Sequence, residues 1–142
     1  MAPQVSVIVP IYHSEPYLER CCRSLWKQTL IDIEFILIID GSSSDARTII
    51  SDTLVSFPQR QEQVKVIEHA ENKGISKSRQ EGHELATGQY LFHCDSDDWL
   101  EPEALELMVA KAKEDNSDLV FFDYLRHYEQ SGKDVLYISA SI

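Results

Sequence analysis

The chain has 142 residues, of which 43% are hydrophobic and 26% charged, and its net charge is −11. This length and composition predict one soluble globular domain over residues 1–142. No run reaches the roughly 18 apolar residues of a membrane span, and the N-terminus lacks the basic region of a secretory signal, so we expect a cytoplasmic location. An acidic surface without a visible basic patch also argues against nucleic acid as a partner.

Strand and helix patterns alternate along the chain. Short β-branched apolar runs predict buried strands, and apolar residues at helical spacing predict the helices between them. In chain order we expect strands at Gln4–Tyr12, Ile33–Asp40, Val64–His69, Gln89–Cys94 and Leu119–Tyr124. Between them we expect a helix capped by Ser14 or Glu15, a helix that Pro58 ends, a helix over Ile75–Ala86 and a helix opened by Glu101–Glu103. A turn around Gly132 followed by Val135–Ile138 comes last.

This alternation predicts an α/β fold with a mostly parallel sheet and helices on both faces, joined by right-handed crossovers. Ligands of such sheets bind beyond the carboxyl ends of the strands. Four segments should therefore meet at that edge: Pro10–His13, Asp40–Ser44, Asn72–Gly74 and Asp95–Asp98.

The densest group of charges is FHCDSDDW, where Asp95 and Asp97 lie two residues apart. In extended backbone both side chains point to one side, and paired carboxylates suit Mg²⁺ or Mn²⁺. A solvated acidic turn with helix caps is the alternative, and Asp98 fits either a third ligand or a cap. An EF-hand calcium loop is excluded because Trp99 and Leu100 stand where a ligand and a glycine are required.

Nucleotide motifs of the glycine-rich kinds are missing from the sequence. There is neither G-x-G-x-x-G nor G-x-x-x-x-G-K-[ST], which excludes a dinucleotide dehydrogenase and a P-loop enzyme. A haloacid-dehalogenase-type phosphatase also uses D-x-D. It is disfavoured because Trp99 follows the motif closely and the motif comes after the fourth strand rather than the first.

Four stretches taken together resemble the family 2 glycosyltransferases. They are VSVIVPIYHSEPYLERCCRSLWKQTL, IEFILIIDGSSSD, ENKGISKSRQEG and ATGQYLFHCDSDDWLEPEAL, and the likeness covers roughly Val5–Leu107. The resemblance implies the Rossmann-like GT-A fold, here incomplete at its C-terminus. It also implies an inverting, hexosyltransferase-type enzyme that takes a nucleotide-sugar donor, with a UDP-sugar favoured. A saccharide or lipid-linked acceptor and cell-surface polysaccharide or lipopolysaccharide synthesis follow from the same likeness.

The resemblance also implies roles for single residues. A donor pocket would be lined by Pro10, Tyr12 and Glu15, with Asp40 on the base edge; Asn72, Gly74 and Arg79 would lie near the base and diphosphate, and Asp95 and Asp97 would hold Mn²⁺ or Mg²⁺. Simpler roles stay open: a sheet-end aromatic for Tyr12, a helix cap for Asp40, and a surface ion pair with Glu84 for Arg79.

The sequence departs from the family pattern at two positions. Ile39 stands where the family often has an acidic residue, and His13 stands where asparagine is common. The carboxylate that serves as general base in the family lies well after the D-x-D, so we expect it beyond Ile142. We therefore expect these residues to be the donor-binding portion, unable to turn over alone, in a full-length protein whose membrane association is left open. A non-catalytic binding module of the same fold is the alternative.

Overall fold

A computed structural model describes residues 2–137. The chain forms two compact units, one up to Glu106 and one from Leu107 onward. A single domain over residues 1–142 stays a prediction. None of the helices in the described residues combines the length and the apolar character that crossing a membrane requires.

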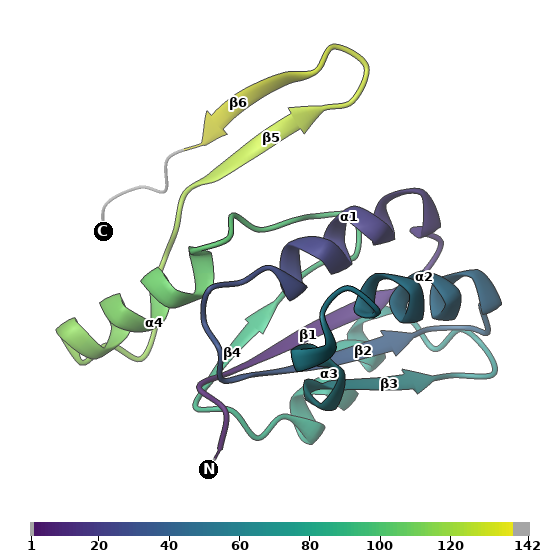
Figure 1. Ribbon diagram of the computed structural model, residues 1–142, viewed down its shortest axis with the longest axis horizontal. Helices are drawn as coiled ribbons and strands as arrows, with labels where there is room; N and C mark the ends of the chain where they lie inside the picture. Colours follow the sequence, from purple (N-terminus) through teal and green to yellow (C-terminus); the bar gives the residue numbers. More distant parts are fainter. Residues whose placement is uncertain (1, 138–142) are drawn as a thin grey trace. The chain divides into compact units, whose positions relative to one another are not determined.

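The first unit is built on a parallel sheet of four strands (Figure 1). Its order is β3-β2-β1-β4, with β1 at Val5–Ile11, β2 at Ile33–Ile39, β3 at Val64–Glu68 and β4 at Tyr90–His93. Both central strands are buried at every position, as expected of parallel strands covered on both faces. The predicted α/β fold and four of the predicted strands are therefore confirmed.

Helices cover the two faces of this sheet. α1 (Glu15–Trp26) and α2 (Ser44–Leu54) lie next to each other (Figure 1), and Trp26 of α1 packs edge-on against Phe35 with ring centroids 5.0 Å apart. On the other face α3 (Ile75–Leu85) approaches β1 closely. A Cβ on Gly82 would lie 2.5 Å from Cγ2 of Ile8, so this helix can pack here only with glycine at that position.

The structure buries the three cysteine thiols and the apolar face of α1. Cys21, Cys22 and Cys94 are free and buried, and burial raises the pKa of Cys22 to about 12, which keeps that thiol protonated. On α1 the predicted apolar stripe from Leu18 to Leu25 is buried.

The second predicted helix ends earlier than expected. α2 stops at Leu54, and Pro58 opens a 3₁₀-helix, η1 (Pro58–Gln63), instead of ending the α-helix. Proline disfavours helical backbone in the residue before it, and Phe57 has φ −133° and ψ 63°. The shift matters because η1 carries Arg60, a buried side chain that holds the end of α1.

The strand predicted at Leu119–Tyr124 is wrong. Leu119–Asp123 lie outside any strand, and β5 (Tyr124–Tyr128) pairs antiparallel with β6 (Lys133–Tyr137) in a separate sheet. Leu119 and Phe121 are 69% and 65% exposed, so the apolar run that suggested a buried strand is not buried. The turn that closes the hairpin, with Gly132 at φ 67°, was predicted. Ile138 lies outside the described residues.

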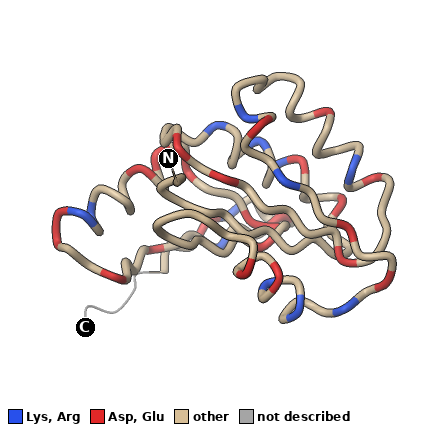
Figure 2. Tube along the Cα trace, turned by 90° about the horizontal axis from the view of Figure 1, so that it is seen from below, with Lys and Arg blue, Asp and Glu red and all other residues tan. Residues whose placement is uncertain are grey.

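The last helix, α4 (Ala104–Asp115), begins just after the predicted opening at Glu101–Glu103. Acidic residues, 24 Asp and Glu against 13 Lys and Arg in the sequence, are spread along the trace (Figure 2). The absence of a nucleic acid partner stays a prediction.

Candidate functional site

A cleft of about 460 Å³ opens at the carboxyl ends of the parallel strands. It is lined by residues from all four predicted segments: Pro10, Ile11, Tyr12, His13, Ser14, Tyr17, Asp40, Asn72, Gly74, Ile75, Ser78, Asp95, Ser96 and Asp97. Residues as far apart in the sequence as Pro10 and Asp97 meet here because parallel strands place their carboxyl ends at one edge. The predicted convergence is therefore confirmed.

A smaller hollow of about 200 Å³ adjoins the cleft and shares Ile11–His13 and Asp40 with it. Glu15 lines this hollow, where its carboxylate accepts a hydrogen bond of 3.0 Å from Oγ of Ser43. Ile39 lines it too, so that position contributes apolar surface next to Asp40.

The first strand ends in two aromatic residues at the mouth of the cleft. Tyr12 is 54% exposed, and its ring meets that of His13 edge-on at 4.1 Å. His13 has φ 50°, in the left-handed region that asparagine and histidine enter more readily than most residues. Histidine is therefore one of the residues that this backbone accommodates. Both rings are available to a ligand at the strand end.

Asp40 lies at the end of β2 and is only 4% exposed. Its Oδ1 accepts from the backbone N–H of Lys73 at 2.7 Å, and its Oδ2 accepts from that of Gly74 at 2.9 Å. Burial alone would raise the pKa of this carboxyl, but these bonds and one from His69 hold the pKa below its usual value. Asp40 is therefore an anion that orders the loop before α3.

The helix-cap alternative for Asp40 is wrong. The N-cap of α2 is Ser43, whose Oγ accepts from the backbone N–H of Ala46 at 3.1 Å. Because a carboxylate offers about four lone-pair positions, Asp40 keeps acceptor capacity for a ligand beyond its bonds to the protein.

The loop before α3 turns at Gly74, with φ 94°. A side chain would be strained at this φ, and the turn lets Gly74 donate its N–H both to Asp40 and to Oδ1 of Asn72, the latter at 2.8 Å. The predicted pair Asn72 and Gly74 is thus part of one hydrogen-bonded turn against Asp40.

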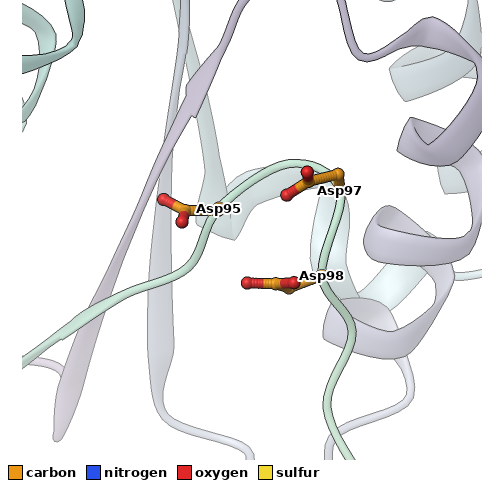
Figure 3. Close-up of side chains that lie close together, drawn as sticks. All are labelled: Asp95, Asp97 and Asp98. Carbon is orange, nitrogen blue, oxygen red and sulfur yellow. The ribbon is translucent and has the colours of Figure 1, made fainter. Parts of the chain in front are cut away.

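The acidic turn follows β4. The carboxylates of Asp95, Asp97 and Asp98 offer oxygens within 4.8 Å of one another, and Asp97 and Asp98 leave the turn on the side where Asp95 lies (Figure 3). Burial and the charges of Asp97 and Asp95 raise the pKa of Asp98. Three hard oxygen ligands with unfavourable mutual charge fit a divalent cation such as Mg²⁺ or Mn²⁺. Asp98 lies close enough to be the third ligand.

Arg79 on α3 lies beside this turn and does not line the cleft itself. Its Nη2 donates to Oδ1 of Asp95 at 2.8 Å. The ion pair with Glu84 that the helix suggested does not form, since Glu84 accepts instead from Gln80. Within the described residues, buried Nε of Arg79 has no hydrogen-bond partner. The guanidinium thus has donor capacity left beside the acidic turn.

The acidic turn is held against the first helix. Oγ of Ser14 and Oγ of Ser96 are 2.5 Å apart and both residues are buried. Ser14 is the N-cap residue of α1, as predicted, but its hydroxyl contacts Ser96 and makes no side-chain cap bond. The middle residue of the D-x-D is therefore part of the scaffold, while its neighbours face solvent.

Two residues near the cleft were not expected from the sequence. Ser78 is fully buried on α3, lines the cleft, and its Oγ has no partner within the described residues. His69 is buried behind the cleft, with Nδ1 3.0 Å from Oδ1 of Asp40. The signal for His69 was its place at the carboxyl end of a predicted strand. Ser78 gave no signal apart from its place on the small-residue face of a helix.

Comparison with known proteins agrees with this geometry. Residues 6–140 match the model of the family described as Glycosyl transferase family 2. The chain is 40% identical over 131 residues to the putative glycosyltransferase EpsH of Bacillus subtilis, covering 92% of this chain and 36% of that protein. It is 32% identical over 130 residues to the chondroitin synthase of Escherichia coli, covering 92% of this chain and 18% of that one. The chain therefore spans well under half of either relative.

The crystal structure of S. aureus TarS 1–349 in complex with UDP superposes with a TM-score of 0.71 at 30% identity, over 83% of this chain and 34% of that one. The fold of the first unit, the order of its motifs and the family match point the same way. This chain belongs to the family 2 glycosyltransferases.

Proposed function

We propose that this protein transfers a sugar from a nucleoside-diphosphate donor, a UDP-sugar, to a saccharide or lipid-linked acceptor with inversion. The observation that carries the proposal is the meeting of Tyr12, Asp40 and the acidic turn in one cleft at the strand ends. The UDP complex of TarS supports the nucleotide, and the chondroitin synthase relative supports a polysaccharide product. The general base expected beyond Ile142, the inactivity of these residues alone and the cytoplasmic location stay predictions.

Asp95 and Asp97 would hold Mn²⁺ or Mg²⁺, with Asp98 beside them. Their oxygens lie close enough together for one ion, and carboxylate oxygen is the ligand that these cations prefer. The bound cation would stabilise negative charge on the diphosphate leaving group as a Lewis acid. It would also give an anionic donor a positive partner in a chain of net charge −11.

The other residues of the cleft bind and orient the donor in this proposal. Pro10 and Tyr12 offer an apolar and aromatic surface for the nucleotide base. Asp40 offers a fixed carboxylate to the hydrogen-bond donors of that base. Glu15 in the adjoining hollow accepts from ribose hydroxyls, and Ser78 places a buried hydroxyl at the cleft wall. Binding energy of this kind positions the anomeric carbon for attack.

The test is a calorimetric titration of the chain with UDP and with GDP, each with and without Mn²⁺. We expect UDP to bind only weakly without the metal and clearly with it, and GDP to bind less tightly than UDP. A well-folded sample that binds neither nucleotide under any of these conditions would point to the non-catalytic module and overturn the proposal.

Replacing Arg79 is expected to change the affinity for Mn²⁺ and the affinity for UDP in opposite directions. Replacing it by glutamine removes the partner of Asp95, so Mn²⁺ alone should bind up to about fivefold more tightly, as expected for an exposed ion pair. UDP in the presence of Mn²⁺ should bind about tenfold more weakly, because the diphosphate loses a charged donor. Calorimetry with each ligand measures both effects.

Arg23→Gln is the matched control for Arg79→Gln, because the side chains of Arg23 and Arg79 are both 39% exposed and both pair with a carboxylate. Arg23 pairs with Glu19 on α1, and the control should change neither affinity. A change of the same sign for metal and nucleotide in Arg79→Gln would contradict the role given to its guanidinium.

A further inference from the structure

His69 is buried between two carboxylates. Its side chain is 3% exposed, with Nδ1 3.0 Å from Oδ1 of Asp40 and Nε2 2.5 Å from Oε2 of Glu81 on α3. Its backbone N–H donates to the carbonyl of Ile39 at 2.9 Å, which fixes the residue at the end of β2. The imidazole therefore connects the carboxylate at the cleft to α3.

The two contacts require particular protons. An ionised carboxylate only accepts hydrogen bonds, and a neutral imidazole has a single N–H. Both ring nitrogens can donate, to Asp40 and to Glu81, only if the ring is an imidazolium. One positive charge then lies between two negative ones and compensates the buried charge of Asp40.

The electrostatic surroundings favour the same state. The hydrogen bond to Asp40 raises the pKa of His69, burial opposes it, and the bond to Glu81 and its charge raise it further. The titratable groups that act on the ring are Asp40 at the end of β2, Glu81 on α3 and Lys73 in the loop, and only Lys73 disfavours the proton.

Asp40 connects His69 to the loop that lines the cleft. The same Oδ1 that faces His69 accepts from the N–H of Lys73, and Oδ2 accepts from that of Gly74. Removing the imidazolium takes away one of the hydrogen bonds that orient Asp40 and so weakens its hold on this turn. The geometry of Asn72 and Gly74 at the cleft thus depends on a side chain that lies outside it.

We propose that His69 is a positioning residue of the donor site, whose imidazolium holds Asp40 and the Lys73–Gly74 turn in the geometry that binds the nucleotide, so that affinity depends on one buried proton. The inference rests on the proposed nucleotide binding. The protonated form is favoured in the folded protein, so the effect is fully present at low pH and is lost as the pH rises through the raised pKa of His69.

The first experiment measures the Kd of UDP with Mn²⁺ by calorimetry between pH 5.5 and 9. We expect the affinity of the unmodified chain, relative to His69→Gln, to fall about tenfold across this range, the size expected for one hydrogen bond to a charged group. At low pH, His69→Gln should bind UDP about tenfold more weakly than the unmodified chain. It should also lack the fall in affinity with rising pH, here called the pH step. His83→Gln, an exposed histidine on α3, is the control and should keep the step.

Glu81→Gln separates positioning from a merely structural role. The amide can accept from, or donate to, a neutral ring, so this variant should keep full affinity at low pH while its step moves to lower pH. A step at the same pH in Glu81→Gln and in the unmodified chain would contradict the inference, as would a step that persists in His69→Gln.

The second experiment needs no nucleotide. Imidazole ¹⁵N shifts should show both ring nitrogens of His69 protonated at pH 6, and amide exchange at Lys73 and Gly74 should speed up about tenfold in His69→Gln. A neutral ring at pH 6, or unchanged exchange in the variant, would overturn the inference even if UDP binds. Failure of every nucleotide to bind would instead overturn the proposed function, and the exchange data would still decide the role of His69.

Discussion

Replacing Asp97 by asparagine is expected to weaken Mn²⁺-dependent binding of UDP by more than about a hundredfold. Loss of an outer partner of a metal ligand typically costs 10- to 100-fold in metal affinity, and loss of a direct ligand should cost more. The amide keeps the size of the side chain, so the turn held by Ser14 and Ser96 should survive. Asp95→Asn should have an effect of the same size. Calorimetry with and without Mn²⁺ measures both.

The controls distinguish the metal site from a solvated acidic turn. Asp52→Asn removes an exposed carboxylate from α2 and should leave UDP binding unchanged. Asp98→Asn tests the third carboxylate: a loss similar to that of Asp97→Asn identifies a ligand, and a small loss identifies a turn residue. If UDP binding by Asp95→Asn and Asp97→Asn depends on Mn²⁺ as strongly as it does in the unmodified chain, the assignment of the ion to this cluster is refuted.

The largest effect on stability is expected at Arg60, which is 4% exposed. Its guanidinium donates to the carbonyls of four residues that follow or end α1: Trp26, Gln28, Leu30 and Ile31. Arg60→Ala removes these bonds together and leaves buried carbonyls without a donor. We expect the free energy of unfolding to fall by about 3–5 kcal/mol, measured by urea denaturation followed by circular dichroism.

Two further variants test this explanation of Arg60. Arg60→Lys keeps a positive charge but cannot donate to several carbonyls at once. Its free energy of unfolding should therefore lie between that of the unmodified chain and that of Arg60→Ala. Arg47→Ala removes an exposed guanidinium that pairs with Glu68 and should cost less than about 1 kcal/mol. Similar losses in Arg60→Ala and Arg47→Ala would show that the bonds of Arg60 to the backbone are not what stabilises the fold.

Much of the fold could be predicted because its signals are local. β1 and β2 are apolar at every position except Ser6 and Glu34, a pattern typical of strands covered on both faces. Their alternation with helices then implied a parallel sheet, and the sheet implied one edge for Tyr12, Asp40 and Asp95. The main features of the candidate site followed from topology.

The same local reasoning failed where tertiary context decides. The apolar run at Leu119–Asp123 has the composition of a buried strand but is largely exposed, and the ladder forms further along, at Tyr124–Tyr128. Pro58 predicts the end of a helix but opens a 3₁₀ turn. A strand needs a partner as well as a composition, and composition alone does not show where the partner lies.

The sequence by itself determined the order of strands and helices, the buried strands and the segments that reach the cleft, because each depends on the periodicity of neighbouring residues. The tertiary structure alone decided which charged groups meet. Arg79 pairs with Asp95 rather than Glu84, His69 lies between Asp40 and Glu81, and Arg60 reaches back to Trp26. These partners are 12 to 34 residues apart, and a charged side chain in a sequence has many possible partners at such separations. Only the packing of α3 and η1 against the sheet selects among them.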